Sequence, residues 1–139
     1  MSKYVIYKNK RTRHHPSIQI DVLEDGTWEN IEITDSPTSQ GSYEEFDVNP
    51  NPNSNKKSYF RKYLRRDKLR HRGEELKKYR LVLSDEIKID VYVSIIKEKM
   101  VESLIMKLYP KKGTHHLRIL KQSAIKKARK KPVDHRPKL

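Results

Sequence analysis

Two runs of alternating polar and apolar residues, joined by a short turn, constrain the fold of this chain more than any other feature. Residues 17–22 read SIQIDV and residues 28–34 read WENIEIT. Such alternation is typical of a strand with one face buried and the other in solvent. The Asp25-Gly26 pair between the runs favours a hairpin turn. We therefore predict an antiparallel hairpin, and we expect its core-facing side chains to be Ile18, Ile20 and Val22 in the first strand and Ile31 and Ile33 in the second.

The segments around this hairpin give weaker signals. Residues 4–7 and 79–83 are predicted to be strands, whereas residues 59–63 are compatible with a strand or a helix. Residues 35–55 are rich in Ser, Pro, Asn and Gly. They are predicted to form a long loop around a short extended piece at 43–48.

A helical pattern follows. Ser84 is a candidate N-cap, and Asp85 and Glu86 suit the positive end of a helix dipole. Apolar residues recur at helical spacing from Ile96 onward, and Pro110 would end a helix. We expect one helix over 85–109, although the alternation at 87–93 also fits a strand. A second, basic helix is expected at 115–131, before a disordered end at 132–139.

Length and composition allow one modest core. The chain has 139 residues, of which 34% are hydrophobic and 36% are charged. We expect a compact α+β domain over residues 1–110 and a basic C-terminal extension over 111–139.

The net charge of +14 is unevenly distributed along the chain. Residues 1–13 hold five cations and no acid, whereas residues 14–55 hold nine acids and no Lys or Arg. Residues 56–83 hold twelve cations and three acids, and residues 110–139 hold eleven cations and one acid. Separate basic segments of this kind suit a phosphate backbone, and nucleic acid is the expected partner.

Several classes of site are excluded or disfavoured. The absence of Cys excludes disulfides and thiolate chemistry. No apolar run is long enough for a membrane helix and the N-terminal residues do not resemble a secretory signal, so we expect a cytoplasmic protein. The two His-His pairs lack the spacing of any metal motif, so we expect no metal and no cofactor.

One candidate site combines two segments at the end of the hairpin. The first is the basic run Arg11-Thr12-Arg13-His14-His15, and the second is the hydroxyl run that contains Thr34 and Ser36. Antiparallel pairing through Asp25-Gly26 would bring these segments to one edge of the sheet. Guanidinium and imidazole groups there could grip a phosphate and shuttle a proton.

Two further runs suit nucleic-acid binding. Residues 59–66 interleave aromatic and cationic side chains, which can stack bases and pair with phosphates. The candidate contacts in this run are Tyr59, Arg61, Lys62, Arg65 and Arg66. The C-terminal run supplies an electrostatic contact with little sequence specificity, through Lys126, Lys127, Arg129 and Lys130.

The order of these pieces resembles the MazF/PemK-like toxin superfamily, including its ToxN-type branch. The matching residues are His15-Pro16 before a strand, the strand end Ile33-Thr34-Asp35-Ser36, and Leu83-Ser84-Asp85 at a helix start. Over about residues 3–108, this resemblance implies a small, strongly curved SH3-like sheet or barrel with a C-terminal helix. It also implies a metal-independent endoribonuclease that cuts single-stranded RNA and is held in check by an antitoxin, either an acidic protein or an RNA.

The resemblance also implies roles for individual residues. Arg13 or Arg11 would stabilise the charged phosphorane, and Thr34 and Ser36 would match the family's hydroxyl residues. His14 or His15 could act as general base or acid. The chain departs from the family in having His-Pro instead of Arg-Pro and in placing Asp35 between the two hydroxyl residues.

Three hypotheses follow from the sequence. The first is a toxin-type endoribonuclease, and the second is a non-catalytic DNA- or RNA-binding accessory protein of a phage or mobile element. The third is a module that binds an acidic protein. Composition supports the first two equally, and only the convergence of His, Arg, Thr and Ser and the resemblance favour the first.

Overall fold

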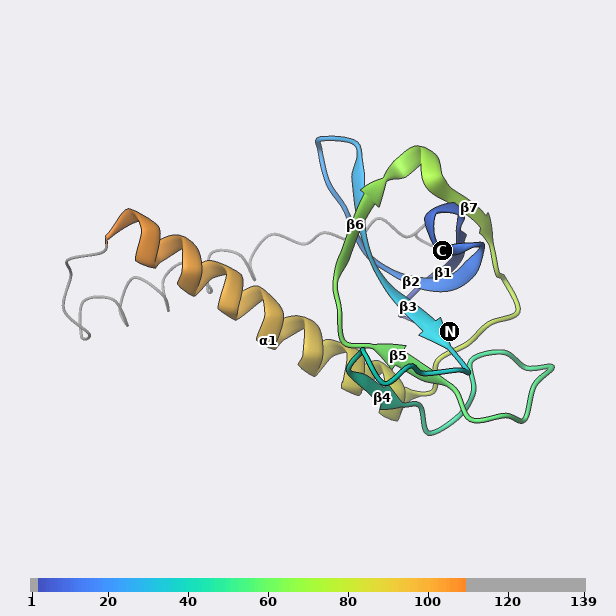
Figure 1. Cartoon of the computed structure of the whole chain (residues 1–139). Helices are drawn as coiled ribbons and strands as arrows, with labels where there is room; N and C mark the ends of the chain where they lie inside the picture. Colours follow the sequence, from blue (N-terminus) through green and yellow to red (C-terminus); the bar gives the residue numbers. More distant parts are fainter. Residues whose placement is uncertain (1–2, 110–139) are drawn as a thin grey trace. The chain divides into compact units, whose positions relative to one another are not determined.

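A computed structural model describes residues 3–109 of the chain and shows an α+β fold (Figure 1). Its elements, in chain order, are β1 (Ile6–Asn9), the short 3-10 helix η1 (Lys10–Thr12), β2 (His15–Val22), β3 (Thr27–Thr34), β4 (Tyr43–Glu45), β5 (Tyr59–Arg61), β6 (Arg65–Lys68), the 3-10 helix η2 (Leu69–His71), β7 (Arg72–Glu75) and α1 (Leu83–Leu108). The α+β class predicted from the sequence is confirmed.

β3 is the strand around which the sheet is built. It pairs with β2 along one edge, and along the other it pairs first with β6 and then with β5. The full order is β4-β5-β3-β2-β1-β7, and every pairing is antiparallel. The predicted hairpin of β2 and β3 is confirmed, with Gly26 at a φ of 83° in its turn. Glycine reaches this left-handed region without the steric cost that a side chain brings.

One face of the sheet carries the apolar core. Ile6, Ile18 and Ile31 lie opposite one another on β1, β2 and β3, and all three are buried. Ile33 and Phe60 form a second buried pair across β3 and β5. Each such side chain contributes about 1.5–3 kcal/mol when it is fully buried. This pattern confirms the expected inward position of the isoleucines at 18, 31 and 33.

The opposite face of the hairpin is also buried, which the sequence analysis did not predict. Ser17, Gln19 and Asn30 were assigned to the solvent side by their alternation, yet they are among the buried polar residues. Trp28 lies on this face as well, fully buried, with its ring edge-on to Tyr7 at a centroid distance of 6.1 Å. A bulge between Gln19 and Asp21 interrupts the ladder of β2 with β3. Both sides of this hairpin are therefore interior.

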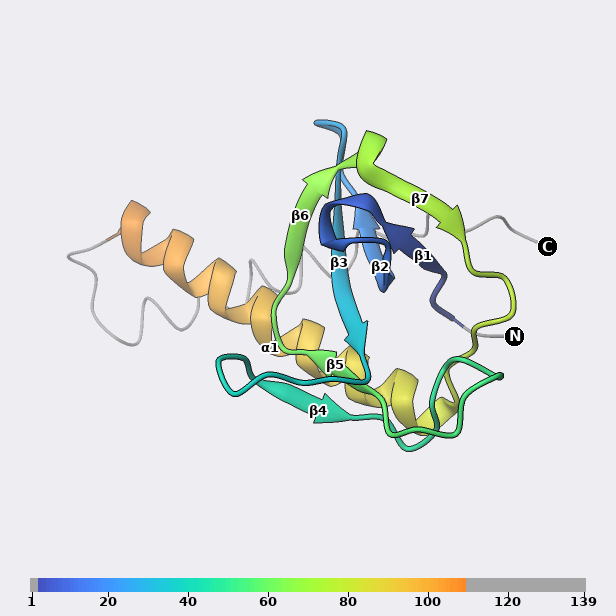
Figure 2. The ribbon, with the colours of Figure 1, turned by 45° about the vertical axis from the view of Figure 1, so that its right-hand side comes forward.

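The burial of the polar face results from the curl of the sheet. Figure 2 shows β6 and β7 on opposite sides of β1, β2 and β3, with η2 joining them. β7 packs tightly on β1, because a side chain at Gly73 would place its Cβ 3.0 Å from the carbonyl oxygen of Lys8. The sheet is nevertheless open, because among the described strands β7 pairs with β1 alone and not with β4 or β6. The SH3-like barrel that the resemblance implies is therefore not confirmed.

Three local predictions are now decided. The segment 59–63 contains a strand, β5, and the alternation at 87–93 belongs to a continuous helix. The strand predicted at 79–83 is wrong: these residues connect β7 to α1, and the Arg80 backbone N–H donates to the Pro50 carbonyl instead of a strand ladder. β propensity alone does not make a strand where no partner strand lies alongside. Ser84 is not an N-cap either, because α1 begins one residue earlier at Leu83.

The start of α1 holds the long loop in place. The Asp85 carboxylate is fully buried and accepts hydrogen bonds from the backbone N–H groups of Asp47 and Val48, at 2.8 and 3.2 Å. Lys88 donates to the Asp47 carboxylate at 2.7 Å and to the Glu45 carbonyl. The loop between β4 and β5 is thereby tied to the first turn and a half of the helix.

The chain divides into two units within α1, after Ile89, and each is described by itself. The described part of the second unit, residues 90–109, is almost entirely helix and exposes several apolar side chains: Val91, Ile95, Met100, Leu104 and Leu108. Within residues 3–109, no helix is both long and apolar enough to cross a membrane. The helix predicted at 115–131 and the disordered end predicted at 132–139 lie outside the described residues.

The role of Asp85 gives a first prediction. Asp85→Ala leaves two backbone donors without their acceptor, and we expect it to lower the free energy of unfolding by about 1–3 kcal/mol. Asp85→Asn keeps one acceptor oxygen and should lose less. Urea unfolding monitored by circular dichroism measures both, with Ser103→Ala on the exposed side of α1 as a control that should stay within about 0.5 kcal/mol of the parent. Equal stability of Asp85→Ala and the control would contradict this role.

Candidate nucleic-acid interface

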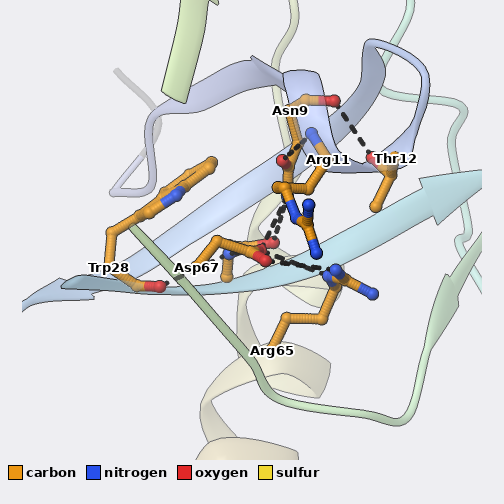
Figure 3. A network of polar contacts seen from close by, with 7 residues as sticks. Asn9, Arg11, Thr12, Trp28, Arg65 and Asp67 are labelled. Carbon is orange, nitrogen blue, oxygen red and sulfur yellow. Dashed lines mark hydrogen bonds and ion pairs between the residues drawn. The ribbon is translucent and has the colours of Figure 1, made fainter. Parts of the chain in front are cut away.

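A polar network occupies the interior of the curled sheet (Figure 3). The Asp67 carboxylate of β6 accepts from the amide nitrogens of Asn9 on β1 and Asn30 on β3, each at 3.0 Å. The same carboxylate accepts two hydrogen bonds from the Arg65 guanidinium, at 3.1 and 3.2 Å. A direct bond of 3.1 Å joins Asn9 to Asn30. Buried polar groups need such mutual satisfaction, because each unpaired one costs about 1–3 kcal/mol.

Asn9 carries this order into the loop between β1 and β2. Its side-chain oxygen accepts from the Arg11 backbone N–H at 2.9 Å, which caps η1. Its backbone carbonyl accepts from the Thr12 hydroxyl and from the His14 N–H. In Figure 3 the Arg11 side chain extends from the loop on the side of the Asp67–Arg65 pair. The basic loop is therefore held from inside by a single buried residue.

The same loop contains backbone strain. Arg13 has φ 57° and ψ 38°, and His14 has φ 63°. Residues with a side chain pay about 1–2 kcal/mol each for the left-handed region, and strain of this kind concentrates at functional sites. Both side chains are exposed. The chain thus uses two charged or titratable side chains where glycine would fit the backbone better.

A second basic connection, η2 between β6 and β7, lies against this loop. The ladder between β1 and β7 pairs Asn9 with Arg72. The pKa of His71 in η2 is lowered, first by burial and then by the charges of Arg70 and Arg11, with a smaller effect of Lys68. Arg11, on the β1–β2 loop, therefore contributes to the electrostatic potential at His71, as Arg70 in η2 does. We call the five residues Lys10, Arg11, Arg13, Lys68 and Arg70 the cationic edge.

The side chains of the cationic edge carry charge that no carboxylate in the described part of the chain offsets. None of its five side chains has an ion-pair partner within residues 3–109. By contrast, Lys62 pairs with Glu44 at 3.6 Å and Lys57 pairs with Glu45 at 3.8 Å. Eight further cations in this part of the chain also have no ion pair but lie outside the two connections: Lys56, Arg61, Arg72, Lys77, Lys78, Arg80, Lys99 and Lys107.

Arg72 stands behind the cationic edge. Its guanidinium lies 4.3 Å from the centroid of the Tyr7 ring and donates to the Gln19 side chain at 2.6 Å. These two contacts hold the cation against the interior face of the sheet. Arg72 therefore has a structural role next to the cationic edge and is not one of its five residues.

The structure places the predicted hydroxyl residues in local turn contacts. The last ladder pair of β2 and β3 at this end is Ser17 with Glu32, so the strands are not paired at His15 and Thr34. Thr34 pairs instead with Tyr59, and its hydroxyl accepts from the Ser36 N–H at 3.0 Å. The Ser36 hydroxyl donates to Asp35. These bonds are ordinary turn chemistry, and no hydrogen bond or ion pair within residues 3–109 joins either hydroxyl to Arg13, His14 or His15.

The aromatic and basic run at 59–66 is divided between structural and exposed positions. Phe60 is core, Arg65 belongs to the Asp67 network, and Arg66 pairs at 3.1 Å with the buried Glu29. Lys62 is ion-paired and Tyr59 is half-buried in the β3–β5 ladder. Within this run, and in the described part of the chain, Arg61 has no ion-pair partner. Its guanidinium contacts the ring of the exposed Tyr63. Lys126, Lys127, Arg129 and Lys130 lie outside the described residues.

Sequence reasoning missed Asn9, Asn30, Asp67 and His71. A buried Asn or Asp has no sequence signature of its own, because its environment arises only in the folded sheet. His71 carries one available signal, since it stands between Arg70 and Arg72. Within residues 3–109 no group of three or more His, Cys, Asp or Glu side chains could hold a metal ion.

The Asp67 network gives a prediction on stability and pH. Burial raises the pKa of Asp67, but hydrogen bonds from Arg65, Asn30 and Asn9 outweigh burial and leave that pKa below its usual 3.8. A carboxyl with a depressed folded pKa stabilises the fold above its unfolded pKa, and this contribution is lost as the pH falls through the folded value. We therefore expect Asp67→Asn to destabilise the protein at pH 7 and to flatten the loss of stability below pH 4.

Urea unfolding of the parent and of Asp67→Asn between pH 7 and pH 3 measures both effects. Because the variant leaves Arg65 and two amides poorly satisfied, its cost at pH 7 should be about 1–3 kcal/mol. The difference between the two proteins should shrink in acid. A difference that stays constant over this range would contradict the assignment.

Known proteins add no further guide to this site. No family model matches the chain, and no similar protein is found among curated sequences or solved structures. The resemblance to MazF/PemK-like toxins therefore stays a prediction from short motifs.

Proposed function

We propose that this protein binds nucleic acid through the cationic edge, with the phosphate backbone as its principal contact. The observation that carries the proposal is that two basic connections meet where Asn9 pairs with Arg72, and that their five cations have no ion-pair partner within residues 3–109. Cations brought together without carboxylate partners keep their full attraction for an anion.

The loop geometry supports this function beyond simple attraction. A flexible basic tail loses conformational entropy when it binds, whereas the β1–β2 loop is fixed by three hydrogen bonds that Asn9 accepts. Side chains on an ordered backbone lose less freedom on binding. Arg11 presents a guanidinium, which matches two phosphate oxygens at once.

Phosphate contacts of this kind give little sequence specificity. We therefore expect binding to depend strongly on salt and weakly on base sequence. An acidic protein partner is the competing interpretation. A surface that recognises an acidic protein does not need to bind RNA.

A pair of double variants with the same change in net charge tests the proposal. Arg11→Ala/Arg70→Ala removes two charges from the cationic edge, whereas Lys57→Ala/Lys62→Ala removes two charges that are ion-paired with Glu45 and Glu44. Fluorescence anisotropy with a labelled single-stranded RNA over a salt series is the measurement. We expect the first variant to weaken binding by about tenfold and to reduce the slope of log K against log salt by about 1.4. The second should change the affinity less than about twofold. Equal effects would show that only net charge matters.

Arg13→Gly separates function from folding in the same assay. Glycine relieves the left-handed backbone of residue 13, although it also adds entropy to the unfolded chain. The variant should therefore be as stable as the parent in urea unfolding and bind RNA more weakly.

A second proposal is cleavage of the bound RNA, favoured by the position of His71. Its Nδ1 atom is buried without a hydrogen-bond partner among the described residues, and its neighbours are cations of the edge. The lowered pKa keeps this imidazole neutral at pH 7, as a general base requires. In that reaction the 2′-hydroxyl proton passes to Nε2 of His71, because Nδ1 is buried, while the 2′-oxygen bonds to phosphorus and the bond to the 5′-oxygen breaks. Protonation of the leaving oxygen by His14, His15 or water yields a 2′,3′-cyclic phosphate and a 5′-hydroxyl.

Incubation with end-labelled single-stranded RNA in EDTA tests this second proposal. We expect cleavage by the parent, a loss of about a hundredfold or more in His71→Ala, and retained binding in that variant. Thr34→Ala is the informative control, because its hydroxyl is engaged in a turn and its loss should leave the rate nearly unchanged. Binding without cleavage by the parent would leave only the first proposal. A rate lost in Thr34→Ala but kept in His71→Ala would return the chemistry to the hydroxyl residues.

A further inference from the structure

Tyr63 is an exposed aromatic residue at a fixed bend between β5 and β6. The residue has 53% of its surface exposed to solvent. The bend is tight, because the Tyr63 N–H donates to the Arg61 carbonyl at 2.8 Å. The preceding N–H, of Lys62, donates to the Ser42 carbonyl at 2.7 Å and ties the bend to the chain before β4. The backbone of this aromatic residue is therefore held in place although its ring faces solvent.

One arginine contacts the Tyr63 ring. The Arg61 guanidinium carbon lies 5.3 Å from the centroid of the ring, a cation–π contact. Arg65 follows two residues later, as the first residue of β6. Arg65 is in turn bound to the network that carries the Arg11 loop. Tyr63 is thus connected through Arg65 to the cationic edge.

We propose that Tyr63 is a base-stacking platform that makes the protein selective for single-stranded nucleic acid. This inference rests on the proposed binding function and deepens it by naming the class of ligand. Unpaired bases can leave their own stack and lie on an aromatic side chain, whereas bases in a duplex keep their faces covered. Arg61 adds a cation beside the same ring, where a phosphate next to the stacked base would lie.

The length of β6 sets how far a ligand must reach. Tyr63 and Leu69, the first residue of η2, are six residues apart, and at a rise of about 3.3 Å per residue they are separated by at most about 20 Å. A ligand that reaches both must span this distance. Short oligonucleotides should therefore bind much more weakly than those that cover the whole of β6.

Anisotropy with two labelled probes tests the inference: oligouridine of about 12 nucleotides and a duplex RNA of the same length. We expect Tyr63→Ala to weaken oligouridine binding about tenfold or more, as the loss of one stacked base does, and to leave duplex binding within about twofold. Tyr63→Phe and Tyr63→Trp keep a stacking face and should retain at least about half of the parent affinity. Tyr109→Ala removes another exposed tyrosine and serves as the matched control.

The outcomes distinguish this inference from the function on which it rests. If the parent binds neither probe, the proposed binding function itself is wrong. If the parent binds oligouridine and Tyr63→Ala binds it equally well, the function stands and the stacking platform is overturned. A loss of affinity in Tyr63→Phe as large as in Tyr63→Ala would also overturn it, since the hydroxyl rather than the ring would then be the contact.

Discussion

The Asp67 carboxylate joins strands that do not pair with one another, and the rest of the fold depends on that contact. β1 and β6 are separated in the sheet by β2 and β3, yet the Asn9 side-chain nitrogen lies 3.0 Å from a carboxylate oxygen of Asp67. This distance requires a strongly curled sheet, whose concave side must then be filled. Asn30, Arg65 and the Trp28 ring fill it, so the interior is partly polar. A carboxylate at the centre of such an interior is stable only because every partner is present.

The uneven charge along the sequence becomes local neutralisation in the fold. The acidic segment around β4 faces the basic residues that follow it, so Glu44 and Glu45 pair with Lys62 and Lys57. Asp47 pairs with Lys88 at the start of the helix. Much of the basic block at 56–66 is therefore balanced inside the structure. Within residues 3–109, five of the cations that keep no ion-pair partner lie on the two connections that form the cationic edge.

The features that were predictable from the sequence are those set by neighbouring residues. The hairpin of β2 and β3 follows from its alternation and its Asp-Gly turn, and α1 follows from its helical spacing and Pro110. The polar network was not predictable in the same way, because Asn9 is 21 residues from Asn30 and 58 from Asp67. Asn30 reads locally as a solvent-facing strand residue, and Asn9 and Asp67 stand in basic segments that show no strand pattern. The strand predicted at 79–83 was wrong for a related reason, since a strand exists only where another strand accepts its hydrogen bonds.

The strained loop connects the stability of the fold to its proposed function. Two successive residues, Arg13 and His14, adopt the left-handed backbone, which costs the folded state free energy that glycine would recover. The loop keeps this conformation because Asn9 fixes it on three sides: at its cap, at the Thr12 hydroxyl and at the His14 N–H. The free energy that orders the loop therefore comes from the buried network, and what it maintains is a cluster of exposed cations. An interior that is polar where a simpler sheet would be apolar is consistent with a network that serves to hold a binding loop as well as to fill space.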